Sequence, residues 1–244
     1  MNMELQEVVS EIKKKENKKV VLTIYRDKKS KDYTVKKSSV QLDTVSYKMK
    51  EKKIGYIAVS QFLENTGDQF DKAVTALEKK GMKSLIIDLR DNGGGLLNTC
   101  TQMVSRVIDK DKLIVYTKDK EGNKEEFKSD SGKTLDIPII ILVNGNTASA
   151  SEIMTGCLKD YGKATVVGTT TYGKGIVQNI MPLTDGSAIK FTIAKYYTPN
   201  GTDIHKKGIK PDVKVKMSDA QWKKAQTDEK ADKQLKKAIE LLEK

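Results

Sequence analysis

Short apolar runs alternate with segments of helical periodicity through most of this 244-residue sequence, and this alternation restricts the fold more than any other feature. The runs typical of buried strands are residues 54–59, 85–89, 113–116, 139–143 and 165–167. The segments with apolar residues at helical spacing are residues 70–77, 101–108 and 150–158. A chain built in this way is expected to form an α/β fold, in which helices cover the strands of a mixed sheet.

The two ends of the chain depart from this alternation. Residues 4–14 have helical periodicity, and the strand-like runs 20–25 and 33–35 are joined by polar residues that suit a hairpin turn. Near the carboxyl end, Ser218 is a plausible helix cap and Leu235 begins an apolar stripe. We therefore divide the chain into three parts, residues 1–42, 43–215 and 216–244. The first part is too small to hold a core of its own.

The apolar residues give no sign of a membrane segment. The longest strongly apolar stretch is Ile137–Val143, whereas a helix needs about 18 to 20 apolar residues to cross a bilayer. The first residues also lack the basic region, apolar region and cleavage site of a secretion signal. The sequence therefore indicates either a cytoplasmic protein or a chain whose start is missing.

A net charge of +12 invites a comparison with nucleic-acid-binding proteins. Only Arg26, Arg90 and Arg106 are arginines, although the planar fork of arginine dominates the recognition of bases and phosphates. The lysines are spread over every predicted element and interleaved with acidic residues. We interpret them as a solvated surface and expect no nucleic-acid partner.

Few residues are candidates for histidine or thiol chemistry. His205 is the single histidine and lies in a polar stretch typical of a loop. We therefore assign surface or loop positions to Asp203, His205 and Asp212. Cys100 and Cys157 lie in predicted helices without metal-ligand spacing, and we interpret them as small buried residues rather than a disulfide.

A serine and a lysine are the strongest catalytic candidates. Ser149 lies in the small-residue run Thr147–Glu152, and Lys174 follows 25 residues later between two glycines. Flanking glycines allow close backbone approach, so the lysine side chain can enter a crowded cavity. A lysine base must be neutral, and burial favours the neutral amine. The pair predicts a serine nucleophile with a buried lysine base.

Gln178 extends this candidate site. It lies four residues after Lys174, so in an extended stretch both side chains point to the same face. Gln178 is then placed to orient the amine or the serine by hydrogen bonding.

Ser149 also has a purely structural interpretation. With Glu152 it fits the capping-box pattern, in which the two side chains satisfy the first free amides of a helix. That role would explain the serine without catalysis. It does not account for the glycine-flanked Lys174.

Three glycines, Gly93 to Gly95, follow the predicted strand 85–89 and precede a helix. Backbone amides at such a position suit a developing oxyanion. A tight turn is the simpler interpretation of the same residues. The sequence around them has neither of the common phosphate-binding glycine patterns.

Together these segments resemble the carboxyl-terminal processing peptidases, which are serine peptidases with a serine and lysine dyad. The resemblance extends from Leu5 over nearly the whole chain. It rests on motifs in the family's order and spacing: Asp88-Leu89-Arg90 with the glycine run, Thr147 to Ile153, Lys159 to Gly162, Gly173-Lys174-Gly175 with Gln178, Tyr197 to Gly201, and Gly208 to Val213.

The resemblance implies an α/β peptidase core of the crotonase and ClpP type. It also implies roles for individual residues: Ser149 as nucleophile, Lys174 as general base, Gln178 as the supporting polar residue, and the amides of Ala150 and of Gly94 or Gly95 as the oxyanion hole. The implied activity is an ATP-independent endopeptidase that cleaves proteins near their carboxyl termini. It needs no metal or other cofactor.

The chain departs from the family pattern at its amino end. Residues 1–42 resemble only the later helix and closing strands of a PDZ module, and the carboxylate-binding loop is absent. We therefore expect a partial PDZ-like module, a peptidase core over residues 43–215 and a helical tail over residues 216–244. Family members imply a location outside the cytoplasm or in the cell envelope, with a membrane anchor in a longer form and self-association left open. This chain shows neither signal nor anchor.

Two other functions remain alternatives. A noncatalytic peptide-binding scaffold would retain the peptidase fold without a working site. An acyl-thioester enzyme of the crotonase type would also use paired amides for an oxyanion, but it gives no reason for Lys174 to follow Ser149 in this pattern. The joint presence of Ser149, Lys174 and Gln178 favours the peptidase.

Overall fold

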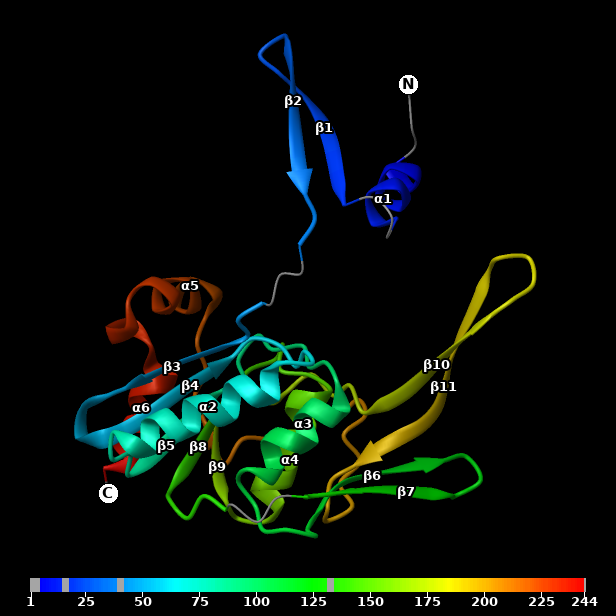
Figure 1. The fold of residues 1–244 in the computed structure, drawn as a ribbon. Coiled ribbons are helices and arrows are strands. Elements are labelled where there is room, and N and C mark those ends of the chain that lie inside the picture. Colours follow the sequence, from blue (N-terminus) through cyan, green and yellow to red (C-terminus); the bar gives the residue numbers. More distant parts are fainter. Residues whose placement is uncertain (1–4, 15–17, 39–41, 131–133, 244) are drawn as a thin grey trace. The chain divides into compact units, whose positions relative to one another are not determined.

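The structure, a computed structural model, describes residues 5–14, 18–38, 42–130 and 134–243. It divides into two compact units, Met1–Leu42 and Asp43–Lys244 (Figure 1). The helices are α1 (Leu5–Lys13), α2 (Thr66–Lys79), α3 (Leu97–Ser105), α4 (Ala150–Asp160), α5 (Asp219–Thr227) and α6 (Lys233–Leu242). The strands are β1 (Lys19–Arg26), β2 (Lys29–Lys36), β3 (Val45–Met49), β4 (Ile54–Val59), β5 (Ser84–Asp88), β6 (Leu113–Asp119), β7 (Lys124–Lys128), β8 (Ile139–Val143), β9 (Ala164–Gly168), β10 (Ile176–Pro182), β11 (Ala188–Tyr197) and β12 (Val213–Lys214).

The first unit holds α1 and an antiparallel hairpin of β1 and β2. The turn residues Asp27 and Lys28 both have positive φ, 52° and 59°. Such a turn matches the right-handed twist of the flanking strands, so the predicted hairpin is confirmed. The helix expected from residue 4 is present from Leu5, and Glu4 itself lies outside the described residues.

A six-stranded sheet forms the centre of the second unit, in the order β12-β9-β8-β5-β4-β3. Its neighbouring strands are parallel, except for the antiparallel pair of β3 and β4. Side chains alternate along β5: Leu85 and Ile87 join one hydrophobic cluster, and Ile86 joins a second one on the opposite face. The α/β fold with a mixed sheet is therefore confirmed.

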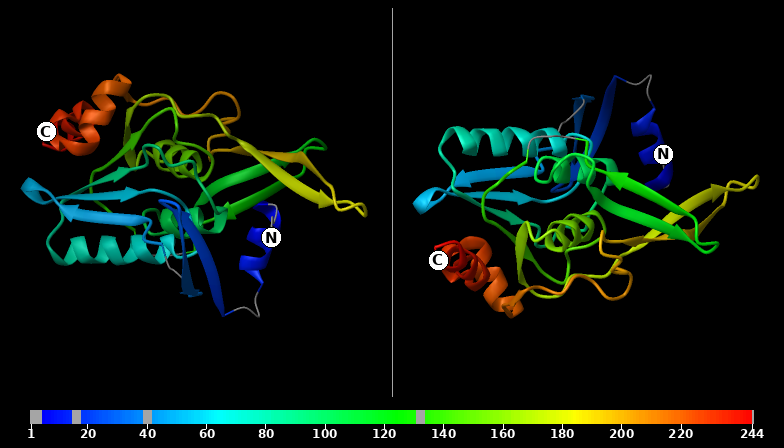
Figure 2. Two further views of the ribbon diagram at one scale, coloured as in Figure 1. Left: turned by 90° about the horizontal axis from the view of Figure 1, so that it is seen from above. Right: turned by 90° about the horizontal axis from the view of Figure 1, so that it is seen from below.

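Helices cover both faces of this sheet. Buried side chains of α2, α3 and α4 belong to the larger cluster, whereas Leu235 and Ala238 of α6 pack on the other face with Ile86, Ile140 and Leu142. Figure 2 shows α2 on one side of the sheet and the carboxyl-terminal helices on the other. The tail is thus a structural layer of the second unit.

A second, antiparallel sheet has the order β10-β11-β6-β7. Only residues Ala194–Tyr197 of β11 pair with β6. The remainder of the β10–β11 hairpin therefore extends past β6 (Figure 1). The hairpin exposes apolar side chains, among them Ile180, Phe191 and Ile193.

Sequence periodicity missed part of this architecture. It identified the core of β6 but neither β7 nor the β10–β11 hairpin, because charged and exposed strands lack the apolar pattern of buried ones. It also predicted a helix over residues 101–108, whereas α3 begins at Leu97, directly after the glycine turn. Helix ends depend on the preceding backbone, which periodicity does not report.

Candidate active site

Ser149 stands at the junction of the loop after β8 and the first turn of α4. Its φ of 56° and ψ of −118° are unusual for a residue with a side chain, and backbone strain of this kind is concentrated at functional sites. Glu152 Oε2 accepts the Ser149 N–H at 2.9 Å, as in a capping box. Ser149 and Glu152 thus form a capping box at the start of α4, in which the Glu152 N–H also donates to Ser149 O at 2.8 Å.

Glu152 connects the serine to the lysine segment. Its carboxylate is fully buried and accepts four hydrogen bonds. The donors are Ser149 N at 2.9 Å, Thr171 Oγ1 at 2.5 Å, Gly173 N at 2.7 Å and Lys174 N at 2.8 Å. One side chain thus fixes the backbone of both catalytic candidates. The sequence indicates only a capping role for Glu152, because nothing in its local pattern shows which distant amides it meets.

Thr171 extends this connection to a third segment. Besides donating to Glu152, its hydroxyl accepts the N–H of Ile209 at 2.7 Å. Thr171, Glu152 and Ile209 are all buried. The motif that contains Ile209 therefore supports the segment before Lys174.

The glycine turn lies against the serine. A Cβ atom added to Gly94 would lie 2.8 Å from Ser149 Cβ and 2.9 Å from Ala150 N, and the φ of Gly94 is +94°. Gly94 is therefore required here both for its backbone conformation and for the space beside the Ala150 amide.

The backbone N–H groups beside Ser149 differ in whether they already have a hydrogen-bond acceptor. The Gly94 N–H donates to Asn92 Oδ1 at 2.9 Å and is already satisfied. Within the residues that the structure describes, the N–H groups of Gly95 and Ala150 have no hydrogen-bond partner. Ala150 is the first residue of α4, where the N–H has no partner inside the helix.

Lys174 differs from the expectation of a buried base. Its side chain is exposed, and it forms neither a hydrogen bond nor an ion pair with any residue of the described ranges. Residues 172–175 have no regular secondary structure, and Gly173 O accepts the Lys206 N–H at 2.8 Å. The two glycines are buried, whereas the side chains of Tyr172 and Lys174 are exposed. The structure thus brings the backbones of Ser149 and Lys174 together through Glu152 but does not join their side chains.

The extended stretch assumed between Lys174 and Gln178 is also interrupted. Strand β10 begins only at Ile176, and the pairing register shifts between Val177 and Gln178. A bulge of this kind breaks the alternation of side chains, so the argument for a shared face does not hold. Gln178 is exposed on β10, an edge strand of the antiparallel sheet.

The remaining polar candidates have structural contacts. Asp203 Oδ1 accepts the His205 N–H at 2.9 Å, and His205 lies in a turn. Asp212 accepts the Val166 N–H at 2.8 Å and pairs with Lys159 at 2.8 Å. These contacts agree with loop and surface roles. In the described part of the chain, no cluster of three or more His, Cys, Asp or Glu side chains is arranged to hold a metal ion.

Both cysteines are buried and free, as interpreted from the sequence. Burial raises the pKa of the Cys100 thiol to about 12, and that of the Cys157 thiol is also raised by burial. Cys100 Sγ lies 3.2 Å from Ala150 O, so it packs under the first turn of α4. Neither thiol has the character of a nucleophile.

Comparisons with known proteins identify the family of this chain. The profile of peptidase family S41 matches residues 53–215, a range that includes every candidate residue named above from Asn92 to Asp212. A probable CtpA-like serine protease of Staphylococcus aureus strain N315 is 43% identical over 213 residues, which are 86% of this chain and 43% of that protein. The carboxy-terminal processing protease CtpA of Bacillus subtilis strain 168 is 40% identical over 218 residues, 89% of this chain and 47% of that protein. This chain therefore spans less than half the length of either relative.

Solved structures show the same fold. The photosystem II D1 C-terminal processing protease superposes with a TM-score of 0.67 at 29% identity, over 81% of this chain and 55% of that one. A putative peptidase from Parabacteroides merdae has a TM-score of 0.65 at 24% identity, over 82% of this chain and 64% of that one. The second likeness concerns the fold alone.

Proposed function

Because this chain belongs to peptidase family S41, we propose that it is an ATP-independent serine endopeptidase that cleaves protein substrates near their carboxyl termini. The observation that carries the proposal is the buried carboxylate of Glu152, which holds the backbones of Ser149 and Lys174 in one site. A capping role for Ser149 alone would not require that link. The similarity to the two bacterial proteases supports the same activity.

In the proposed reaction, Ser149 Oγ attacks the carbonyl carbon of the scissile peptide bond, and the neutral amine of Lys174 accepts the hydroxyl proton. The lysine then passes that proton to the leaving amine, which yields an acyl-enzyme. Water activated by Lys174 attacks the acyl group and releases the carboxyl product and Ser149. Gln178 orients the amine or the hydroxyl.

The proposed oxyanion hole uses the N–H groups of Gly95 and Ala150, since these are without a partner in the described residues. Gly94 contributes the space between them, because a side chain there would press on Ser149 and Ala150. The amide of Gly94 would join as a donor only after leaving Asn92. Preorganised amides of this kind stabilise the charge that develops in the transition state.

Because the Lys174 amine is exposed without substrate, the bound substrate must help to form the site. A polypeptide bound across Ser149 would cover the exposed side chains of Tyr172 and Lys174 and exclude water from the amine. Exclusion of water favours the neutral amine that a base requires. We therefore infer that substrate binding completes the site, with a move of the lysine side chain toward Ser149.

The test compares Ser149→Ala and Lys174→Ala with the parent chain, using an unfolded protein as substrate and intact mass to identify the products. Both variants are expected to lose at least about a hundredfold in rate, since each removes a reacting group. Lys207→Ala is the matched control, because Lys207 is an exposed lysine in the neighbouring turn. Cleavage at the parental rate by either active-site variant would overturn the assignment.

The pH dependence gives a second test of the lysine. Only the neutral amine accepts a proton, so the parental rate is expected to rise as the pH is raised from about 6 to 9. A rate that stays flat over this range, with the substrate still unfolded, contradicts a lysine base.

The exposed Lys174 is also what a noncatalytic peptide-binding scaffold would show. A serine-directed acylating probe separates the two functions. Labelling that is lost in Ser149→Ala indicates a peptidase. Tight binding of peptides without labelling indicates a scaffold.

The remaining assignments follow from this proposal. Residues 1–42 are assigned to a PDZ-like module, 43–215 to the peptidase core and 216–244 to a helical tail. The substrates are proteins with accessible carboxyl termini, and the location is outside the cytoplasm or in the cell envelope, as the family resemblance implies. In the described ranges, every helix is too short or too polar to pass through a bilayer.

A further inference from the structure

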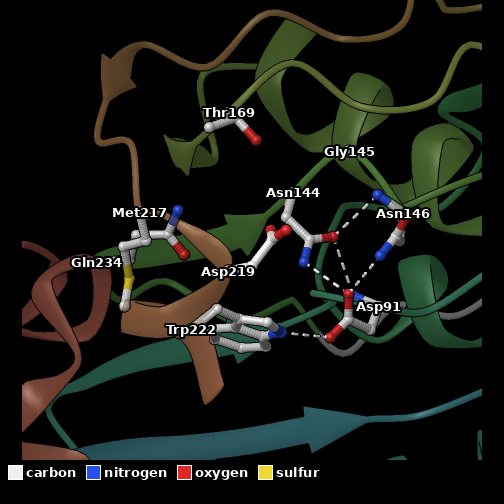
Figure 3. Close-up of a pocket in the computed structure, with 9 residues that line it drawn as sticks. All are labelled: Asp91, Asn144, Gly145, Asn146, Thr169, Met217, Asp219, Trp222 and Gln234. Atoms are coloured by element: carbon white, nitrogen blue, oxygen red, sulfur yellow. Dashed lines mark hydrogen bonds between the residues drawn. The ribbon is translucent and has the colours of Figure 1, made fainter. Parts of the chain in front are cut away.

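The helical tail contacts the loop that forms the proposed oxyanion hole. The contacts reach Arg90 and Asp91, directly after β5, from Trp222 of α5 and from Asp232 and Gln234 at the start of α6. Figure 3 shows the Trp222 indole at one oxygen of the Asp91 carboxylate and the side chains of Asn144 and Asn146 at the other. These residues belong to segments up to 144 positions apart in the sequence.

Arg90 is held by Asp88 and by the tail together. Its side chain is 3% exposed and pairs with Asp88 at 2.6 Å and with Asp232 at 2.8 Å. Gln234 Oε1 accepts a further hydrogen bond from Arg90 at 3.1 Å, and the Trp222 ring centroid lies 4.5 Å from Arg90 Cζ. A buried guanidinium needs all of its partners, because an unpaired buried charge is strongly destabilising.

Asp91 connects the tail to the loop between β8 and Ser149. Its Oδ2 accepts the indole N–H of Trp222 at 2.9 Å, and its Oδ1 accepts the side-chain amides of Asn144 and Asn146 at 2.8 Å each. Burial acts to raise the pKa of Asp91, but the three hydrogen bonds outweigh it and lower that pKa. Asp91 also has a φ of 58°, so its backbone adopts a conformation that needs support.

Asn92 completes the connection to the reacting groups. Its carbonyl accepts the Ala148 N–H at 3.0 Å and the Ser151 hydroxyl at 3.1 Å. Its side chain holds Gly94, which lies against Ser149. A continuous set of contacts therefore runs from Trp222 and Asp232 to the amides beside Ser149.

We propose that Trp222 and Asp232 are positioning residues, which hold the loop of Gly94 and Gly95 in register with Ser149 and Ala150. This inference rests on the proposed peptidase activity for its kinetic consequence. Its structural consequence, a loop made rigid by the tail, is independent of any activity. The tail thus acts on catalysis without touching the substrate.

Amide hydrogen exchange measured by mass spectrometry tests the structural part. The variants are Trp222→Ala, Trp222→Phe, which keeps a ring over Arg90 but loses the N–H to Asp91, and Asp232→Asn, which keeps an acceptor but loses the charge. Lys223→Ala is the control, because Lys223 is the exposed neighbour of Trp222. In Trp222→Ala, exchange in peptides covering residues 91–96 and 144–150 is expected to rise at least about tenfold, with β4 and β8 unchanged.

Kinetics on the same variants test the functional part. Trp222→Ala is expected to lower kcat about ten- to hundredfold with KM nearly constant, because misplaced amides stabilise the transition state less. Trp222→Phe and Asp232→Asn are expected to lie between Trp222→Ala and the parent, and Lys223→Ala to equal the parent. A peptide boronate, whose adduct with Ser149 is tetrahedral, should bind more weakly in the order of the kcat losses.

The outcomes separate the two proposals. Exchange that is unchanged in all three tail variants, or raised equally in every strand, overturns the positioning role. If local exchange rises in the tail variants but the parent chain cleaves no substrate, the positioning role of the tail is supported and the peptidase activity is contradicted. A fall in kcat without faster amide exchange in residues 91–96 and 144–150 also overturns the inference, because the loop was then not loosened.

Discussion

The two halves of the proposed site differ in how they are held. The serine half, with Ser149, Ala150 and Gly94, lies where the chain leaves β5 and β8, and Asn92 and Glu152 hold it by hydrogen bonds. The lysine half, with Lys174 and Gln178, lies at the start of an exposed edge hairpin. The rigid half can stabilise charge before the substrate arrives, whereas in the other half the exposed Lys174 side chain can move toward the substrate while Glu152 holds its backbone.

Only a few contacts join the halves. Glu152 accepts hydrogen bonds from both, and Thr171 supports Glu152 from the lysine side. Substitutions in the serine half should therefore affect stability and activity together. Substitutions of the exposed side chains of Lys174 and Gln178 should affect activity alone.

Gly94→Ala is expected to have the largest effect. The added methyl would meet Ala148 O at 2.7 Å and Ser149 Cβ at 2.8 Å, in a backbone conformation that disfavours a side chain. We expect a rate loss of at least about a thousandfold and a destabilisation of about 2–4 kcal/mol, from strain together with overpacking. Gly93→Ala is the control, since a methyl there meets nothing within 4 Å. Kinetics and urea unfolding provide the measurement, and equal behaviour of the two variants would contradict the close approach.

Glu152→Gln tests the contact that joins the halves. An amide cannot accept all four hydrogen bonds, because its NH₂ group faces donors. We expect a rate about a hundredfold lower and a loss of about 1–3 kcal/mol in stability. Glu64→Gln, at an exposed position, should match the parent in both measurements. An active Glu152→Gln variant would show that the halves are positioned without this carboxylate.

Thr171→Val should have a smaller effect of the same kind. It removes one donor to Glu152 and leaves the buried Ile209 N–H without its acceptor, which costs about 1–3 kcal/mol. The rate should fall about thirtyfold, because three of the four donors to Glu152 remain. Thr171→Ser keeps the hydroxyl and should restore most of the rate. If serine restores neither rate nor melting temperature, the methyl group rather than the hydroxyl is what matters at this position.

Gln178→Ala should change activity and leave stability unaffected. The side chain is exposed, so the unfolding free energy should stay within about 0.5 kcal/mol of the parent. A rate loss of about tenfold is expected if Gln178 orients the reacting groups. Asn179→Ala, one residue along the exposed strand, is the control for the strand itself. Matching rates for the two variants would remove Gln178 from the proposed mechanism.

Sequence patterns predicted the buried strands better than the exposed ones. Apolar periodicity located the buried strands β4, β5 and β8 closely, because burial on both faces leaves a continuous apolar run. It did not find β7 or the β10–β11 hairpin, where exposed strands have mixed composition. The sequence also provides no measure of the exposure of Lys174. Burial of this lysine was expected from its flanking glycines, which permit burial but do not produce it.

The sequence by itself determined the α/β class, the order of the buried strands β4, β5, β6, β8 and β9 along the chain, and the candidate residues Ser149, Lys174 and Gln178. Tertiary structure alone decided which groups meet: Glu152 with the Lys174 amide, Trp222 and Asp232 with the loop before Gly94, and solvent with the Lys174 amine. Local patterns report the environment of a segment, because periodicity depends on neighbours within a few residues. Hydrogen bonds between segments far apart depend on how the layers pack, and only the folded chain specifies that.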